Sequence, residues 1–263
     1  MIDMELFRFA VFAVLLLIMA GWEYVTPYRD AGQNRRSVRW LTNFGLMAGS
    51  AVLGRFSVGA AMILGAQWAQ DQGWGLFHLV AFPGWIAALI SIAVLDAAVY
   101  WQHRLTHIVP LFWRFHRVHH CDLAFDVSTA VRFHPIEIMA SAIYKSAFVV
   151  MLGADPWVVV VYETLLSGFA LFNHGNVHLP PRLDRVVRVL FVTPDMHRVH
   201  HSIETVETNS NYGNILSVWD RVFASYRAKT RINDHDMPIG LEQFRDDGSQ
   251  SLWGTLLLPF RRS

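Results

Sequence analysis

Residues 100–120 read YWQHRLTHIVPLFWRFHRVHH, and this stretch holds five of the chain's thirteen histidines. Two related runs follow, NHGNVH at 173–178 and MHRVHH at 196–201. Ten histidines therefore fall into four clusters, two spaced H-x-x-x-H and two spaced H-x-x-H-H. Residues three and four apart lie on one face of a helix. Each spacing therefore directs at least two imidazole rings towards one point.

The four clusters predict a dinuclear metal site. Neutral imidazole is the commonest protein metal ligand and suits zinc, copper, iron and nickel. A single H-x-x-x-H pair is weak evidence, but ten rings packed together without metal would leave many polar atoms unsatisfied. Ten rings are too many for one ion, and two ions would share about five each with positions left open. The expected ligands are His103, His107, His116, His119, His120, His174, His178, His197, His200 and His201.

These runs and their neighbours resemble a known family, the fatty acid hydroxylase and sterol desaturase superfamily of integral-membrane di-iron enzymes. The resemblance rests on DAAVYWQHRLTH (96–107), HRVHH (116–120), RFHPIE (132–137), NHGNVH (173–178), HRVHH (197–201) and NYGNILSVWDRVFASY (211–226). It implies two iron ions (Fe2+/Fe3+), O2 as cosubstrate, and hydroxylation or desaturation at a lipid C–H bond. The histidine spacing alone implies neither iron nor the substrate.

The composition is that of a membrane protein. The 263 residues are 53% hydrophobic and only 16% charged, whereas soluble domains carry nearer a quarter of charged residues. Apolar runs at 6–25, 41–68, 79–100, 136–152 and 156–172 predict an all-α, polytopic bundle of about four to five transmembrane or re-entrant helices. A cytoplasmic helical cap would hold the metal site. We divide the chain into N-terminal helices with an arginine-rich loop (1–78), a catalytic domain (79–227) and a C-terminal tail (228–263), in which 252–260 is expected in the membrane interface.

The distribution of arginines predicts the orientation. By the positive-inside rule, the loop after the first run is cytoplasmic because it holds Arg29, Arg35, Arg36 and Arg39. All four histidine clusters then face the cytoplasm, in what we expect to be a bacterial inner membrane. Charges within the spans are expected to pair or snorkel, as for Arg55, or to pair or line the substrate cavity, as for Lys145 and Glu163.

Several other residues are candidates for supporting roles. Metal-bound imidazoles are commonly oriented by a carboxylate or carbonyl, and Asp96, Asn173 and Asp195 stand near the clusters. His134 is a possible further ligand, although its place before Pro135 favours a structural role. His174 and His178 converge only if the segment after the hairpin is helical. Cys121 is expected to be an ordinary small residue.

The implied reaction needs two electrons from outside the chain. The sequence has no dinucleotide-binding fingerprint, no cysteine set for an iron–sulfur centre and no apparent fused cytochrome. A separate donor such as a ferredoxin or a cytochrome b5-like protein is expected. A cationic face could attract it, although solvated helix faces explain the same residues: Arg114, Arg117, Arg185, Arg188 and Arg198.

Other functions are less consistent with the sequence. A net charge of +1 without a basic stripe argues against nucleic-acid binding. A zinc-dependent membrane hydrolase is an alternative, but the chain has no H-E-x-x-H motif. A non-enzymatic metal or haem protein is another, but haem would require histidines deep within opposing spans rather than at their ends.

Overall fold

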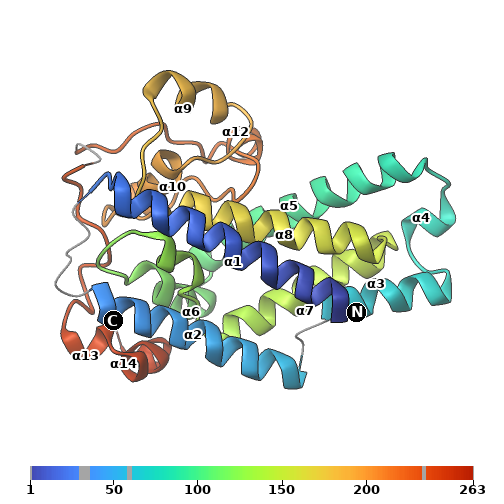
Figure 1. Cartoon of the computed structure of the whole chain (residues 1–263), viewed down its shortest axis with the longest axis horizontal. Helices are drawn as coiled ribbons and strands as arrows, with labels where there is room; N and C mark the ends of the chain where they lie inside the picture. Colours follow the sequence, from blue (N-terminus) through green and yellow to red (C-terminus); the bar gives the residue numbers. More distant parts are fainter. Residues whose placement is uncertain (1, 30–35, 58–60, 233–234, 263) are drawn as a thin grey trace.

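The computed structural model describes residues 2–29, 36–57, 61–232 and 235–262, and this part of the chain is helical with no β-strand, as predicted. Arg35 and the side chain of Arg55 lie outside the described residues. The first eight α-helices build an elongated bundle (Figure 1). They are α1 (Ile2–Val25), α2 (Arg36–Ser57), α3 (Ala61–Gln72), α4 (Leu76–Leu79), α5 (Gly84–Ile108), α6 (Pro110–His120), α7 (Pro135–Leu152) and α8 (Pro156–Asn173).

Four helices are long and apolar enough to cross a membrane, namely α1, α5, α7 and α8. They run roughly along the long axis of the molecule, with α4 at one end and the small helices of the cap towards the other (Figure 1). The span predicted over 41–68 contains α2, which reaches Ser57, and the first part of α3, which starts at Ala61; residues 58–60 between them lie outside the described part of the chain.

The helical hairpin of α7 and α8 begins and ends within one residue of its predicted bounds. Gly153 ends α7 in the left-handed region, at φ 65°, and Asp155 caps α8 by accepting from the N–H of Trp157 at 2.8 Å. A Cβ on Gly153 would lie 2.5 Å from the carbonyl oxygen of Trp74. The turn is therefore closely packed against the connection between α3 and α4.

Lys145 and Glu163 pair with each other, which is one of the two outcomes expected for them. Lys145 Nζ on α7 lies 3.7 Å from Glu163 Oε1 on α8. Arg8 on α1 also reaches Glu163, with Nη1 at 2.9 Å from Oε2. One carboxylate therefore links three helices inside the bundle.

The cap consists of short segments. They are η2 (Val127–Val131), α9 (Pro181–Val187), α10 (Pro194–His200), α11 (Thr205–Thr208), α12 (Val218–Val222), α13 (Asp247–Gln250), α14 (Leu252–Leu257) and η3 (Leu258–Phe260).

A buried ionic network attaches the cap to α2. Arg39 Nε donates to Asp122 at 2.6 Å and its Nη1 donates to Asp126 at 2.9 Å. Burial acts to raise the pKa of Asp122, but the guanidinium groups of Arg39 and Arg132 outweigh it and hold this pKa well below its usual range. Asp122 is therefore ionised. Because it follows His120 by two residues, its pairing with Arg39 fixes the start of the cap next to the second histidine cluster.

The C-terminal tail packs on the bundle. Thr255 and Leu258 are fully buried, and Arg117 on α6 donates to the Leu258 carbonyl at 2.6 Å. The opposite face exposes Trp253, Leu257 and Phe260. The short apolar segment expected at the interface is thus docked on one side and exposed on the other.

Candidate metal centre

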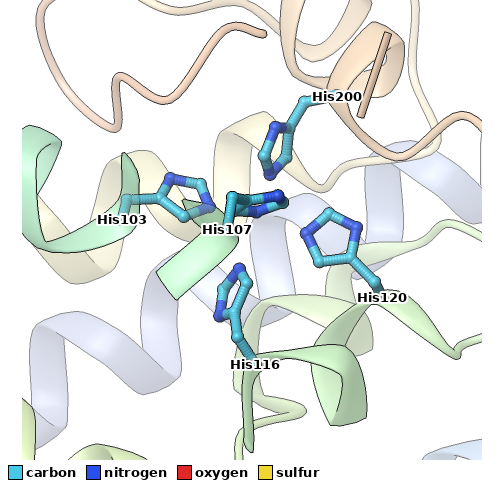
Figure 2. Close-up of side chains that lie close together, drawn as sticks. All are labelled: His103, His107, His116, His120 and His200. Carbon is cyan, nitrogen blue, oxygen red and sulfur yellow. The ribbon is translucent and has the colours of Figure 1, made fainter. Parts of the chain in front are cut away.

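The structure brings nine of the ten predicted histidines together in two adjoining groups. In each group the ligand nitrogens lie within 4.8 Å of one another. The five-histidine group, whose rings converge in Figure 2, is His103, His107, His116, His120 and His200. The four-histidine group is His119, His174, His197 and His201. The rings of His120 and His201 stack across the boundary at 4.6 Å.

Each H-x-x-H-H cluster serves both groups. On α6 the outer pair, His116 and His120, joins the five-histidine group, while His119 joins the other. The cluster at 197–201 does the reverse, since its middle residue, His200, crosses to the five-histidine group. The pairs four residues apart therefore aim at one point, as predicted, and the intervening ring turns to the neighbouring point.

Helix α5 supplies both remaining members of the five-histidine group. It continues to Ile108 rather than ending near Tyr100, so His103 and His107 lie on the same helical face. The two are only partly buried, whereas every other member of the two groups is buried.

Hydrogen bonds on the outer side of the five-histidine group fix the orientation of its rings. His103 Nδ1 lies 2.8 Å from the Tyr212 carbonyl, and His200 Nδ1 lies 2.7 Å from the Ser210 carbonyl. His116 Nδ1 lies 2.6 Å from Glu137 Oε1. These oxygens only accept, so the Nδ1 atoms carry the hydrogen and each Nε2 presents a lone pair.

The inward-facing Nε2 atoms of this group are unsatisfied within the described part of the chain. All five are buried and lack a hydrogen-bond partner among the described residues. Buried polar atoms are normally satisfied. Five converging Nε2 atoms without a partner fit a bound metal ion.

The four-histidine group also fits a metal ion, because its Nε2 atoms lie unusually close to one another. His174 Nδ1 lies 2.7 Å from the Ala170 carbonyl, and His119 Nδ1 lies 3.3 Å from the Arg132 carbonyl. Both Nε2 atoms therefore present lone pairs, yet they lie 3.1 Å apart. His197 Nε2 lies 3.0 Å from the same atom of His174. Lone pairs at this separation repel unless a cation lies between them, so this group also fits a metal ion.

Four rings of the two groups are neutral at neutral pH. Burial lowers the pKa of His174 to about 4 and that of His200 to about 3. Burial also holds the pKa of His119 and of His201 well below the ordinary value. Neutral imidazole is the form that binds metal, so no proton has to leave first.

His178 is the predicted ligand that the structure places outside both groups. Helix α8 ends at Asn173 with His174 as its cap, so the chain is not helical between His174 and His178 and their rings do not share a face. His178 Nδ1 lies 2.7 Å from Asp195 Oδ2, and its ring stacks on Tyr28 at 4.8 Å.

The three predicted orienting residues bond elsewhere. Asp96 accepts from Trp219 Nε1 at 2.8 Å, and Asn173 Nδ2 donates to the Asn214 carbonyl at 2.6 Å. Asp195 pairs with His178 and, at 2.7 Å, with Arg198. Asp96 and Asn173 thus join spans to the cap, whereas Asp195 pairs with residues outside the spans.

Two further residues also lie outside the groups. His134 caps α7, with Nδ1 accepting from the N–H of Ile136 at 3.2 Å and Nε2 3.2 Å from the Leu256 carbonyl. This placement gives it the structural role that its position before proline favoured. Cys121 is buried and donates to the Val118 carbonyl.

Sequence reasoning missed Glu137 as a histidine partner. Its signal was present, because it ends the RFHPIE run and lies in the first turn of α7. The carbonyl partners supplied by Ala170, Ser210 and Tyr212 carry no signal in the sequence, since every residue has a carbonyl.

The cationic face predicted for an electron donor is smaller than expected. Arg117 and Arg198 are buried, and Arg188 Nη2 pairs with Asp184 at 2.6 Å. Arg114 and Arg185 remain exposed.

Comparison with known proteins agrees with this geometry. The chain is similar to human alkylglycerol monooxygenase, at 28% identity over 55% of this chain and 31% of that protein. It is similar to the ornithine lipid hydroxylase OlsE of Rhizobium tropici, at 28% identity over 90% of this chain and 72% of that protein. It is also similar to mouse lathosterol oxidase, at 24% identity over 56% and 48%.

The chain thus spans about a third of the length of the human relative. No solved structure matches. The sequence profile of the fatty acid hydroxylase family matches residues 88–225, which include every member of both histidine groups. Since that match covers over half of the chain, the protein belongs to the fatty acid hydroxylase family.

Proposed function

We propose that this protein is an O2-dependent di-iron enzyme that hydroxylates or desaturates a membrane lipid, with the nine grouped histidines as ligands. The observation that carries the proposal is the orientation of the two nitrogens of each imidazole ring. Acceptors on the outside hold the Nδ1–H of His103, His116 and His200, while all five Nε2 atoms of their group converge inside without donors. This arrangement suits two cations and is unfavourable without them.

The donor set supports a redox-active metal of the iron type. Both groups consist of histidine alone, and imidazole suits iron, copper, nickel and zinc. The relatives bear the names monooxygenase, hydroxylase and oxidase, and zinc has no redox chemistry. Iron therefore fits the donors, the names of the relatives and the family resemblance together.

Bound iron would supply dioxygen activation and cleavage of a C–H bond. The protein holds the ligand rings in place and excludes bulk water from them. Phe133 stacks on His119 with ring centroids 4.3 Å apart and planes at 9°. Phe125 contacts His201 at 5.1 Å. These side chains keep bulk water from the rings, which protects a reactive site from side reactions.

The substrate is proposed to approach from α5. His103 and His107 are the partly exposed members of the two groups and lie at the end of an apolar span. A lipid chain lying along α5 would therefore reach the five-histidine group first. The relatives are named for an alkylglycerol, an ornithine lipid and a sterol, so lipids are the class we propose.

The site is proposed to face the cytoplasm and to receive electrons from a separate protein. Arg29 and Arg36 flank the ends of α1 and α2 at the cap end of the bundle, which the positive-inside rule places in the cytoplasm. A ferredoxin or a cytochrome b5-like protein could dock where Arg114 and Arg185 are exposed.

The test combines metal analysis with oxygen uptake. Protein purified in detergent is expected to contain about two irons per chain and, once reduced, to consume oxygen when a lipid extract is added. Mass spectrometry of the lipids should then show a new hydroxyl group or double bond. A protein that holds one tight zinc, hydrolyses a lipid and consumes no oxygen would disprove the proposal.

A further inference from the structure

A row of aromatic rings leads away from the five-histidine group. The Tyr212 ring lies 5.2 Å from that of His107, measured between centroids. Tyr100 lies 6.2 Å from Tyr212, and Trp101 lies 5.7 Å from Tyr100. Tyr100 is fully buried, whereas Trp101 is 39% exposed. Neighbouring oxidisable rings therefore connect the histidines with the surface of the bundle.

The hydroxyl group of Tyr100 belongs to a directed hydrogen-bond chain. Arg104 Nη1 donates to it at 3.2 Å, and a guanidinium cannot accept. Tyr100 Oη lies 2.7 Å from Ser225 Oγ, and Ser225 donates to Asp220 Oδ1 at 2.7 Å. Because Ser225 uses its one hydrogen on the carboxylate, it accepts the hydrogen of Tyr100. The chain therefore runs from Tyr100 through Ser225 to Asp220.

Asp220 is suited to receive a proton from this chain. It is fully buried and also accepts from the backbone N–H groups of Tyr212 and Gly213, at 2.7 and 2.9 Å. Burial raises the pKa of this carboxyl above its ordinary value. The carboxylate is thus more basic than one at the surface.

We propose that Tyr100 is a redox-active tyrosine. It reduces the metal centre by one electron when the centre has become strongly oxidising and no lipid is bound. The inference rests on the proposed function. One electron passes from Tyr100 through the Tyr212 ring to the centre, and the O–H bond of Tyr100 breaks. Its proton moves to Ser225 Oγ while the proton of Ser225 moves to Asp220. The products are a neutral tyrosyl radical, a protonated Asp220 and a centre reduced by one electron.

The radical is then repaired through Trp101. The Trp101 ring lies 4.8 Å from that of Phe223, directly after α12 of the cap, so it is at the cap end of the span. There a one-electron reductant of the ascorbate or thiol class supplies the electron, and the proton returns from Asp220 through Ser225. The route carries oxidising equivalents outwards and does not serve the donor protein, because a phenol gives up an electron only to a strong oxidant. Its benefit is that the ligand rings themselves are not oxidised.

Tyr162 shows what an ordinary buried tyrosine looks like in this fold. It is as fully buried as Tyr100, but its hydroxyl group finds no partner among the described residues. Oxidation of such a phenol has no acceptor for the proton. Tyr162→Phe is therefore a matched control for Tyr100→Phe, since both remove one buried hydroxyl group.

The test uses iron-loaded protein in detergent, reduced chemically, mixed with oxygen without lipid and frozen at intervals for electron paramagnetic resonance. A tyrosyl radical is expected in the natural protein and in Tyr162→Phe. It should be lost in Tyr100→Phe and strongly reduced in Ser225→Ala, which keeps the phenol, with iron content equal in all four proteins. Repeated exposure to oxygen should leave more oxidised histidine in Tyr100→Phe, measured by mass spectrometry of peptides.

The outcomes separate this inference from the proposed function. Oxygen consumption without a tyrosyl radical, or a radical unchanged in Tyr100→Phe, would overturn the relay and leave the oxidase intact. If iron-loaded protein consumes no oxygen, the proposed function and the protective role fall together. Zinc-loaded protein, oxidised at its surface by a ruthenium photo-oxidant, then tests the side chains alone, and absence of a radical at Tyr100 would also overturn the relay.

Discussion

His116 Nδ1 lies 2.6 Å from Oε1 of Glu137, which joins the end of α6 to the first turn of α7. This contact orients one ring of the five-histidine group and raises its basicity as a ligand. Glu137→Ala should weaken metal binding at this group about 10–100-fold, as is typical when such a partner is lost. Metal retained per chain during titration with a chelator measures the effect.

Metal binding by Glu137→Gln should fall between that of the natural protein and that of Glu137→Ala, since the amide oxygen still accepts a hydrogen bond but carries no charge. The exposed Glu242→Ala is the control. Equal metal retention by Glu137→Ala and this control would remove Glu137 from the site.

His174 and His178 form a matched pair of histidines four residues apart. His174→Ala should lower the iron content from about two to about one per chain and abolish activity, because the ring lies 3.0–3.1 Å from two neighbouring Nε2 atoms. His178→Ala should keep both ions, because its partner is Asp195. If His178→Ala loses an ion while His174→Ala does not, the assignment of ligands after α8 is reversed.

The buried ion pairs of Arg39 should matter for folding. Arg39→Met leaves the buried carboxyl groups of Asp122 and Asp126 without their guanidinium partner, which typically costs about 3–5 kcal/mol. Thermal unfolding in detergent should therefore shift to a clearly lower temperature. Arg182→Met changes an exposed arginine and should have almost no effect; equal midpoints would show that the network is dispensable.

Removal of the metal should make the stability of the folded protein depend on pH. In the stripped protein the folded pKa values of His174 and His200 are about 4 and about 3, below the ordinary 6.5. The unfolded chain therefore takes up protons first as the pH falls. Stability is fully present above pH 6.5 and is lost progressively as the pH falls towards these values. Unfolding temperatures from pH 8 to 5 measure the slope, and a flat profile in stripped protein would contradict it.

The hairpin of α7 and α8 could be predicted closely because local signals decide it. Pro135 and Pro156 begin the two helices, and Gly153 ends the first. The extent of α5 could not be predicted from hydropathy. The apolar run ends near Tyr100, but the polar residues that follow are adequate helix formers, and the helix continues to Ile108.

The candidate site could be predicted as a set of histidines but not as two groups. Spacing shows which rings share a helical face, and this held for His116 with His120. It does not show which of two ions lies opposite each face, because that depends on how α6 and α10 sit relative to each other. Spacing also misled at His178, where the same interval as in His103 and His107 lies outside any helix.

The exchange of His119 and His200 between the groups makes the two short helices sensitive to register. A helix turns by about 100° per residue. One residue inserted between His116 and His119 would therefore rotate His119 and His120 away from their present positions relative to His116. Because His119 and His120 belong to different groups, both ions would lose a ligand from this single change. Length variation is therefore expected to be tolerated in the largely exposed segment at 228–232, whereas an insertion between the histidines of α6 or of α10 should spare neither ion.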